Sequence, residues 1–158
     1  MAKPESTSDN DSVILVDGSS YVYRAYHALP PLSTSSGQPT GAVRGVTTMV
    51  MRILEDHPDS PVGMIFDAKG STFRHDMYDQ YKANRPPMPD DLRPQIKPIY
   101  DICEALGLKI FVVDNVEADD VIGTLATQAE VEGIKTVVST GDKDLAQLVT
   151  KNIRLVNT

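Results

Sequence analysis

Short, continuously apolar runs alternate along this chain with longer segments of mixed polarity, and this alternation constrains the fold more than any other feature. Runs without polar residues at every second position are typical of strands buried on both faces of a parallel sheet. They cover residues 13–16, 62–66, 110–113 and 136–139, with a fifth expected at 153–156. Alternating strands and helices predict right-handed crossovers. The expected fold class is a three-layer α/β domain with a central, mainly parallel sheet.

The segments between these runs carry apolar residues at helical spacing, and two of them end at glycines, Gly107 and Gly133. The first predicted helix covers about 41–55, with Thr40 as its cap. The second runs from Asp90 or Asp91 to Leu106, with a bend or break at Pro94 and Pro98. Two more are predicted over about 117–132 and over 143–148, the last capped in part by Asp142.

Length and composition favour one globular domain. The chain has 158 residues, which is enough for a single core, and no apolar run as long as a membrane span. Residues 1–11 are polar and acidic, and we expect a disordered tail there, followed by a domain over 12–158. The single cysteine, Cys103, excludes a disulfide framework within the chain and fits a reducing cytoplasm.

Acidic residues follow each of the first four runs directly or within a short loop. Since the carboxyl ends of parallel strands meet at one edge of a sheet, these side chains are expected to converge. Glu117 and Asp120 should share a helix face, with Asp119 to one side. The candidate set is Asp17, Asp67, Glu117, Asp119, Asp120, Asp142 and Asp144.

Carboxylates gathered in one place repel one another unless a cation neutralises them. Oxygen ligands without His or Cys suit Mg²⁺ or Mn²⁺, and two such ions about 4 Å apart can hold the attacking and leaving oxygens of a phosphodiester. The seven acids equal the net charge of −7, so metal binding would remove the objection that an acidic chain avoids DNA. Any one of these acids could instead form a turn or cap a helix, and Asp114 is expected to do only that.

Residues 69–97 form a basic segment, with six Lys or Arg against four acids. Cations interleaved with aromatic rings are how proteins hold single-stranded nucleic acid. Phe73, Tyr81, Lys82 and Arg85 are therefore candidate DNA contacts on a helical arch, although a solvated amphipathic helix would give a similar pattern. Arg24, one or two helical turns after Asp17, could reach a scissile phosphate.

Six ordered motifs together resemble the 5′→3′ exonuclease domain of bacterial DNA polymerase I, which is related to flap endonucleases and phage 5′-nucleases of PIN-like fold. They are ILVDGSSY (14–21) with YRAYHA (23–28), FDAKG (66–70), YKANRPPMPDDL (81–92), VEADDVIGTLA (116–126) and STGDKDLAQLV (139–149).

The resemblance implies a site for two Mg²⁺ or Mn²⁺ ions built from the seven acids, with Arg24, Tyr81, Lys82 and Arg85 contacting the phosphate and the 5′ strand. Arg24, Lys82 and Arg85 would act in catalysis. The implied substrate is DNA with a 5′ end or flap, or an RNA primer, cut during replication and repair. The implied setting is the bacterial cytoplasm at the nucleoid, next to downstream polymerase domains.

The family domain extends beyond the sequence given, so we expect this chain to be a truncated portion that binds the second metal poorly and cleaves slowly or not at all. Three alternatives remain. They are a catalytically inactive metal- or DNA-binding fragment, a PIN-type ribonuclease, and a phosphatase of the haloacid-dehalogenase type. The last is disfavoured because Ser19 stands where that class needs a second aspartate.

Overall fold

The computed structural model of this protein describes residues 12–28, 30–68 and 88–157. Its centre is a five-stranded parallel sheet in the order β3-β2-β1-β4-β5, which confirms the predicted fold class. All five apolar runs are strands: β1 (Val13–Asp17), β2 (Val62–Asp67), β3 (Lys109–Val113), β4 (Thr136–Ser139) and β5 (Ile153–Val156). The expected tail, and the part of the basic segment that holds Phe73, Tyr81, Lys82 and Arg85, lie outside the described residues.

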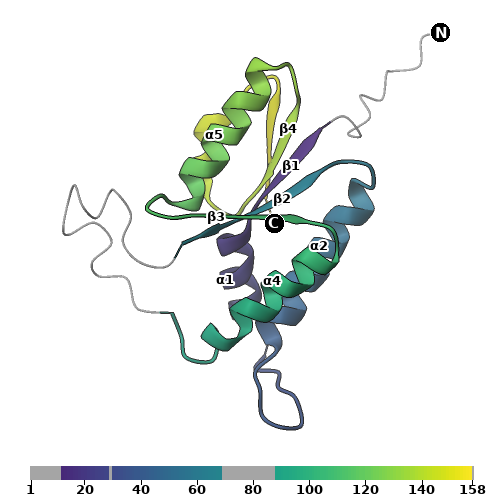
Figure 1. Cartoon of the computed structure of the whole chain (residues 1–158), viewed down its shortest axis with the longest axis vertical. Coiled ribbons are helices and arrows are strands. Elements are labelled where there is room, and N and C mark those ends of the chain that lie inside the picture. The colour runs from purple at the N-terminus through teal and green to yellow at the C-terminus, as the bar shows by residue number, and fades with distance from the viewer. Residues whose placement is uncertain (1–11, 29, 69–87, 158) are drawn as a thin grey trace.

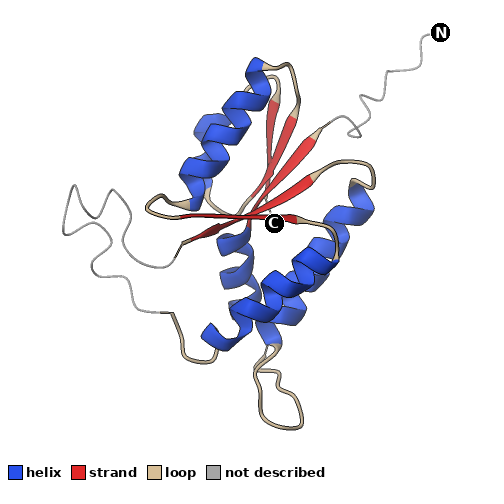
Figure 2. Cartoon of the chain, viewed as in Figure 1, coloured by secondary structure: helices blue, strands red, loops and turns tan. Residues whose placement is uncertain are grey.

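Helices cover both faces of the sheet (Figure 1, Figure 2). One face packs against α1 (Gly18–Ala28), α2 (Gly41–Asp56) and α4 (Ile96–Ala105), and the other against α5 (Ala118–Val131). Alternate residues of the central strand feed the two cores, since Ile14 and Val16 belong to the first and Leu15 to the second. In the described part of the chain, no helix is long and apolar enough to cross a membrane.

The start of one helix differs from the sequence prediction. Neither Asp90 nor Asp91 caps a helix, because a turn is followed by the short 3-10 helix η2 (Arg93–Gln95) and α4 begins only at Ile96. The two prolines lie within η2 and in the first turn of α4, where a missing N–H costs little.

The N-terminus of α2 is capped from a distant segment. Thr40 is its N-cap residue, but the Thr40 side chain makes no capping hydrogen bond. The buried side chain of Gln95 does so instead, because its Oε1 accepts from the Val43 backbone N–H at 3.1 Å while its Nε2 donates to the Asp91 carbonyl at 2.8 Å. This side chain thereby ties η2 to α2.

Candidate metal centre

The carboxyl end of the sheet brings acidic residues of four elements together. Asp17 and Asp67 are the last residues of the neighbouring strands β1 and β2. Helix α1 follows Asp17 at once, which is possible because Gly18 has no side chain to collide with the Phe66 ring. A Cβ atom there would lie 2.6 Å from that ring. The acids of α5 follow β3 after a tight turn, and Asp142 follows β4 as the N-cap of the 3-10 helix η3 (Lys143–Leu148), as predicted.

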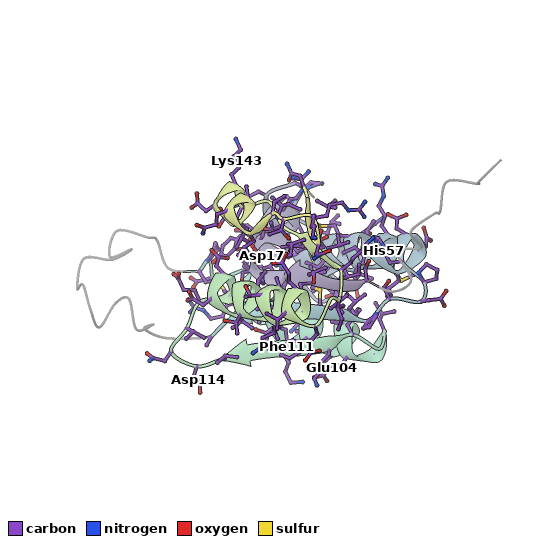
Figure 3. The ribbon with its side chains drawn as sticks, turned by 90° about the horizontal axis from the view of Figure 1, so that it is seen from above. Asp17, His57, Glu104, Phe111, Asp114 and Lys143 are labelled. Carbon is purple, nitrogen blue, oxygen red and sulfur yellow. The ribbon has the colours of Figure 1, made fainter. Side chains whose placement is uncertain are left out.

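One cavity of about 190 Å³ collects five of the seven candidate acids. Asp17 is buried, whereas the side chains of Asp114 and Lys143 extend outward at the edge of the molecule in Figure 3. None of the described residues that line the cavity is basic. The lining consists of Asp17, Ser19, Ser20, Tyr23, Asp67, Glu117, Asp119 and Asp142.

Hydrogen bonds fix the orientation of two of these carboxylates. The Thr140 hydroxyl donates to Asp17 Oδ2 at 2.8 Å, and the Ser20 backbone N–H donates to Asp17 Oδ1 at 3.2 Å. Asp67 Oδ1 accepts from the Ala118 backbone N–H at 2.7 Å, which ties β2 to the start of α5. Asp17 is buried, so its carboxylate depends on these protein donors more than on water.

The acids at the start of α5 divide into two roles. Glu117 is the N-cap residue, and the Asp120 side chain accepts from the Glu117 backbone N–H at 3.1 Å, which completes a capping box. Glu117 and Asp119 both line the cavity, whereas Asp120 does not. Asp144 is exposed and also outside the lining, and its backbone N–H donates to Asp142 Oδ1 at 2.9 Å.

The electrostatics of the cavity favour a bound cation. Burial and, after it, the negative charges of Asp17, Asp142 and Asp67 together raise the pKa of Asp119 to about 7. Burial also raises the pKa of Asp17, although the hydrogen bonds from Thr140 and Ser20 act in the opposite direction. Both shifts show that these carboxylates are costly to ionise together without a positive charge among them.

The donor chemistry fits a hard divalent ion, since the lining offers carboxylate and hydroxyl oxygens. Within the described ranges, however, no three acidic, His or Cys side chains stand close enough to form a ready-made metal-binding group. Like charges repel, so closer approach of the carboxylates would require a cation between them.

Other predicted residues lie elsewhere. Arg24 is exposed on α1 and lines a different cavity, beside Tyr21, Ser139 and Val156, so its predicted contact with a phosphate remains a prediction. Sequence reasoning overlooked the Tyr23 side chain and the serine and threonine hydroxyls next to the acids. The motifs DGSS and STGD, in which hydroxyl residues adjoin an aspartate, contain the signal that could have revealed them.

Similar sequences are found among bacterial polymerases and exonucleases. A family model described as the 5′-3′ exonuclease, N-terminal resolvase-like domain, matches residues 12–158. DNA polymerase I of Pseudomonas aeruginosa is 58% identical over 146 residues, which are 92% of this chain and 16% of that protein. The 5′-3′ exonuclease of Buchnera aphidicola subsp. Baizongia pistaciae is 43% identical over 147 residues, 93% of this chain and 49% of that protein. The chain thus spans only part of each relative.

Solved structures share the fold at low sequence identity. The T5 5′-exonuclease with bound divalent metal ions (zinc) matches with a TM-score of 0.72 and 17% identity over 92% of this chain and 55% of that chain. The bacteriophage T5 flap endonuclease, in a pseudo-enzyme-product complex with DNA and metal ions, matches with a TM-score of 0.68 and 17% identity over 92% and 54%. The resemblance read from the six motifs is confirmed, and the chain belongs to the 5′-3′ exonuclease family as its N-terminal resolvase-like domain, homologous to the N-terminal part of DNA polymerase I.

Proposed function

We propose that this chain supplies most of a divalent-metal site with which a 5′-3′ exonuclease or flap endonuclease hydrolyses DNA phosphodiesters near 5′ ends, in replication and repair as part of a DNA polymerase I. The observation that carries this proposal is the convergence of five carboxylates, from two strand ends, a helix start and a loop, on one cavity. The T5 relatives, which bind divalent metal ions and in one case DNA, support it.

The proposed ligands of Mg²⁺ or Mn²⁺ are the five lining acids, with Asp120 and Asp144 as outer members of the set. When bound, such ions stabilise charge on phosphate oxygens and lower the pKa of water. The contribution of this chain is to hold the carboxylates at the carboxyl end of the sheet. Asp17 is already oriented by its two donors, so little reorganisation of this ligand is needed on binding.

A second cavity, of about 580 Å³, supports a nucleic-acid substrate because it adjoins the first and shares Ser19, Tyr23 and Asp67 with it. Its lining also includes an aromatic ring and two cations, the groups with which proteins hold the bases and phosphates of single strands. They belong to Tyr100, Arg93 and Lys97, whereas the ring of Phe66, which also lines the cavity, is buried in the core. Arg24, Phe73, Tyr81, Lys82 and Arg85 remain proposed DNA contacts on the family resemblance.

The test is Mn²⁺ binding by the purified chain, measured from the electron paramagnetic resonance signal of the free ion. Asp119→Asn should weaken binding roughly tenfold or more, because it removes a carboxylate that lines the cavity. Asp114→Asn is the matched control, since it removes an exposed carboxylate from the turn after β3. Absence of Mn²⁺ binding, or equal losses in the two variants, would overturn the proposed metal site.

Cleavage assays then separate the alternatives. A 5′-labelled flap DNA and a single-stranded RNA of the same sequence are incubated with the chain and Mg²⁺. Slow, Mg²⁺-dependent cutting of the flap DNA in preference to the RNA is expected. Preference for the RNA would favour a PIN-type ribonuclease, and metal binding without cleavage of either would favour an inactive binding fragment.

A further inference from the structure

The loop after β4 is joined to the end of β1 and to the start of α1 by two hydroxyl groups. The Ser20 hydroxyl accepts from the Gly141 backbone N–H at 2.9 Å. The Thr140 hydroxyl donates to Asp17 Oδ2 at 2.8 Å and accepts from the Asp142 backbone N–H at 2.9 Å. A single hydroxyl thereby connects two of the carboxylate-bearing residues that line the acidic cavity.

These bonds lie just beyond the end of the backbone ladder. The parallel pairing of β1 with β4 ends at Val16 and Ser139, so Asp17 and Thr140 are the next residues on each strand. The Thr140 backbone N–H turns away from β1 and donates to the Val156 carbonyl at 3.0 Å. The side chain of Thr140 is therefore what links the two strands at the level of the carboxylates.

Thr140 is buried, with 2% of its surface exposed, and it does not line the cavity. It would therefore act on a cation only through Asp17 and Asp142. A hydroxyl has one proton to donate and two lone pairs to accept with, so using both in fixed directions sets the rotamer of Thr140 and the direction of Asp17 Oδ2 together.

We propose that Thr140 is the positioning residue that holds Asp17 and Asp142 in the mutual arrangement required for divalent-metal binding. The inference rests on the proposed function, because it needs the acidic cavity to be the metal site. Outer hydrogen-bond partners of metal ligands commonly contribute 10–100-fold to metal affinity. Serine can make both bonds, whereas valine, which has the shape of threonine, can make neither.

The experiment compares Mn²⁺ affinity in the wild-type chain and in Thr140→Val, Thr140→Ser and the control Thr124→Val, with far-UV circular dichroism to confirm folding. Thr124 also donates its hydroxyl at 2.8 Å, but to the backbone carbonyl of Asp120 within α5. Thr140→Val should bind Mn²⁺ about 10–100-fold more weakly. Thr140→Ser and Thr124→Val should bind within about threefold of the wild type.

The outcomes separate this inference from the proposed function. If the wild-type chain binds no Mn²⁺, the proposed function fails and this inference fails with it. If the wild type binds and folded Thr140→Val binds equally well, only the inference is overturned. Thr140→Ala removes the same bonds with less bulk and replaces Thr140→Val if that variant does not fold. Failure of both to fold would make Thr140 a determinant of the fold and would also overturn the positioning role.

Discussion

Replacing Asp119 by Asn should make the metal-free chain more stable at pH 8, although Asp119 lies in the candidate site. The folded protein raises the pKa of Asp119 from 3.8 to about 7, first through burial and then through the charges of Asp17, Asp142 and Asp67. Because folding raises its pKa, Asp119 contributes stability that is fully present below pH 3.8, and this stability is lost as the pH rises through 7. Asn carries no charge at any of these pH values, so the variant does not lose this stability as the pH rises.

The size of the effect follows from the two pKa values. Their difference corresponds to about 4 kcal/mol at most. Because the Asp119 side chain is only partly buried, solvent screening reduces the expected gain at pH 8 to about 1–2 kcal/mol. At pH 5, which lies only about one unit above the unfolded pKa of 3.8, about two-fifths of this loss has occurred, so the variant should gain about 0.5–1 kcal/mol there.

The difference in the free energy of unfolding is measured by urea titration in EDTA at pH 5 and pH 8, with far-UV circular dichroism as the signal. The free energy of unfolding of Asp119→Asn should exceed that of the wild type at pH 8 and approach it at pH 5. Asp114→Asn serves as control, since its carboxylate is exposed in a turn and should change little at either pH. A variant that is no more stable than the wild type at pH 8 would refute the claim that burial and the neighbouring carboxylates make the negative charge of Asp119 costly in the folded chain.

Four further predictions concern packing and reactivity. Gly18→Ala should lower the free energy of unfolding by about 1–3 kcal/mol in a urea titration, because the added Cβ meets the Phe66 ring. Gly123→Ala, in mid-helix with its nearest neighbour 3.7 Å away, should instead stabilise by about 0.5–1 kcal/mol. Gln95→Ala should cost about 1–3 kcal/mol in the same assay, since it leaves the α2 N-terminus without its cap. Cys103, buried and with its pKa raised by burial to about 11, should react with iodoacetamide only when the chain unfolds, and fast modification of the native chain would contradict its place in the core.

The strands and the convergence of acids could be predicted because both depend on local pattern and on one rule of parallel sheets. The apolar runs are continuous, so the strands stand out, and residues directly after them must lie at the carboxyl edge. Asp17 and Asp67 occupy that edge for this reason.

The finer arrangement depends on contacts between distant segments, which pattern alone does not encode. Spacing placed Glu117 and Asp120 on one helix face with Asp119 to one side, whereas Glu117 and Asp119 line the cavity and Asp120 does not. The Glu117–Asp120 pair already had the form of a capping box, which occupies Asp120. The hydrogen bond between Thr140 and Asp17 joins residues 123 positions apart. The Gln95 cap on α2 likewise crosses 52 positions and displaces the local capping expected of Thr40.

The central claim is that a divalent ion binds at the carboxyl end of the sheet, and paramagnetic broadening by Mn²⁺ in ¹H–¹⁵N spectra of the chain tests it most directly. Substoichiometric Mn²⁺ should first broaden the backbone amides of Ser19, Ala118 and Asp142, which surround the acidic cavity. The amides of Lys109 and Gly133, at the opposite ends of β3 and α5, should stay sharp. Uniform broadening, or broadening that starts at Lys109 and Gly133, would contradict the assignment of the metal site.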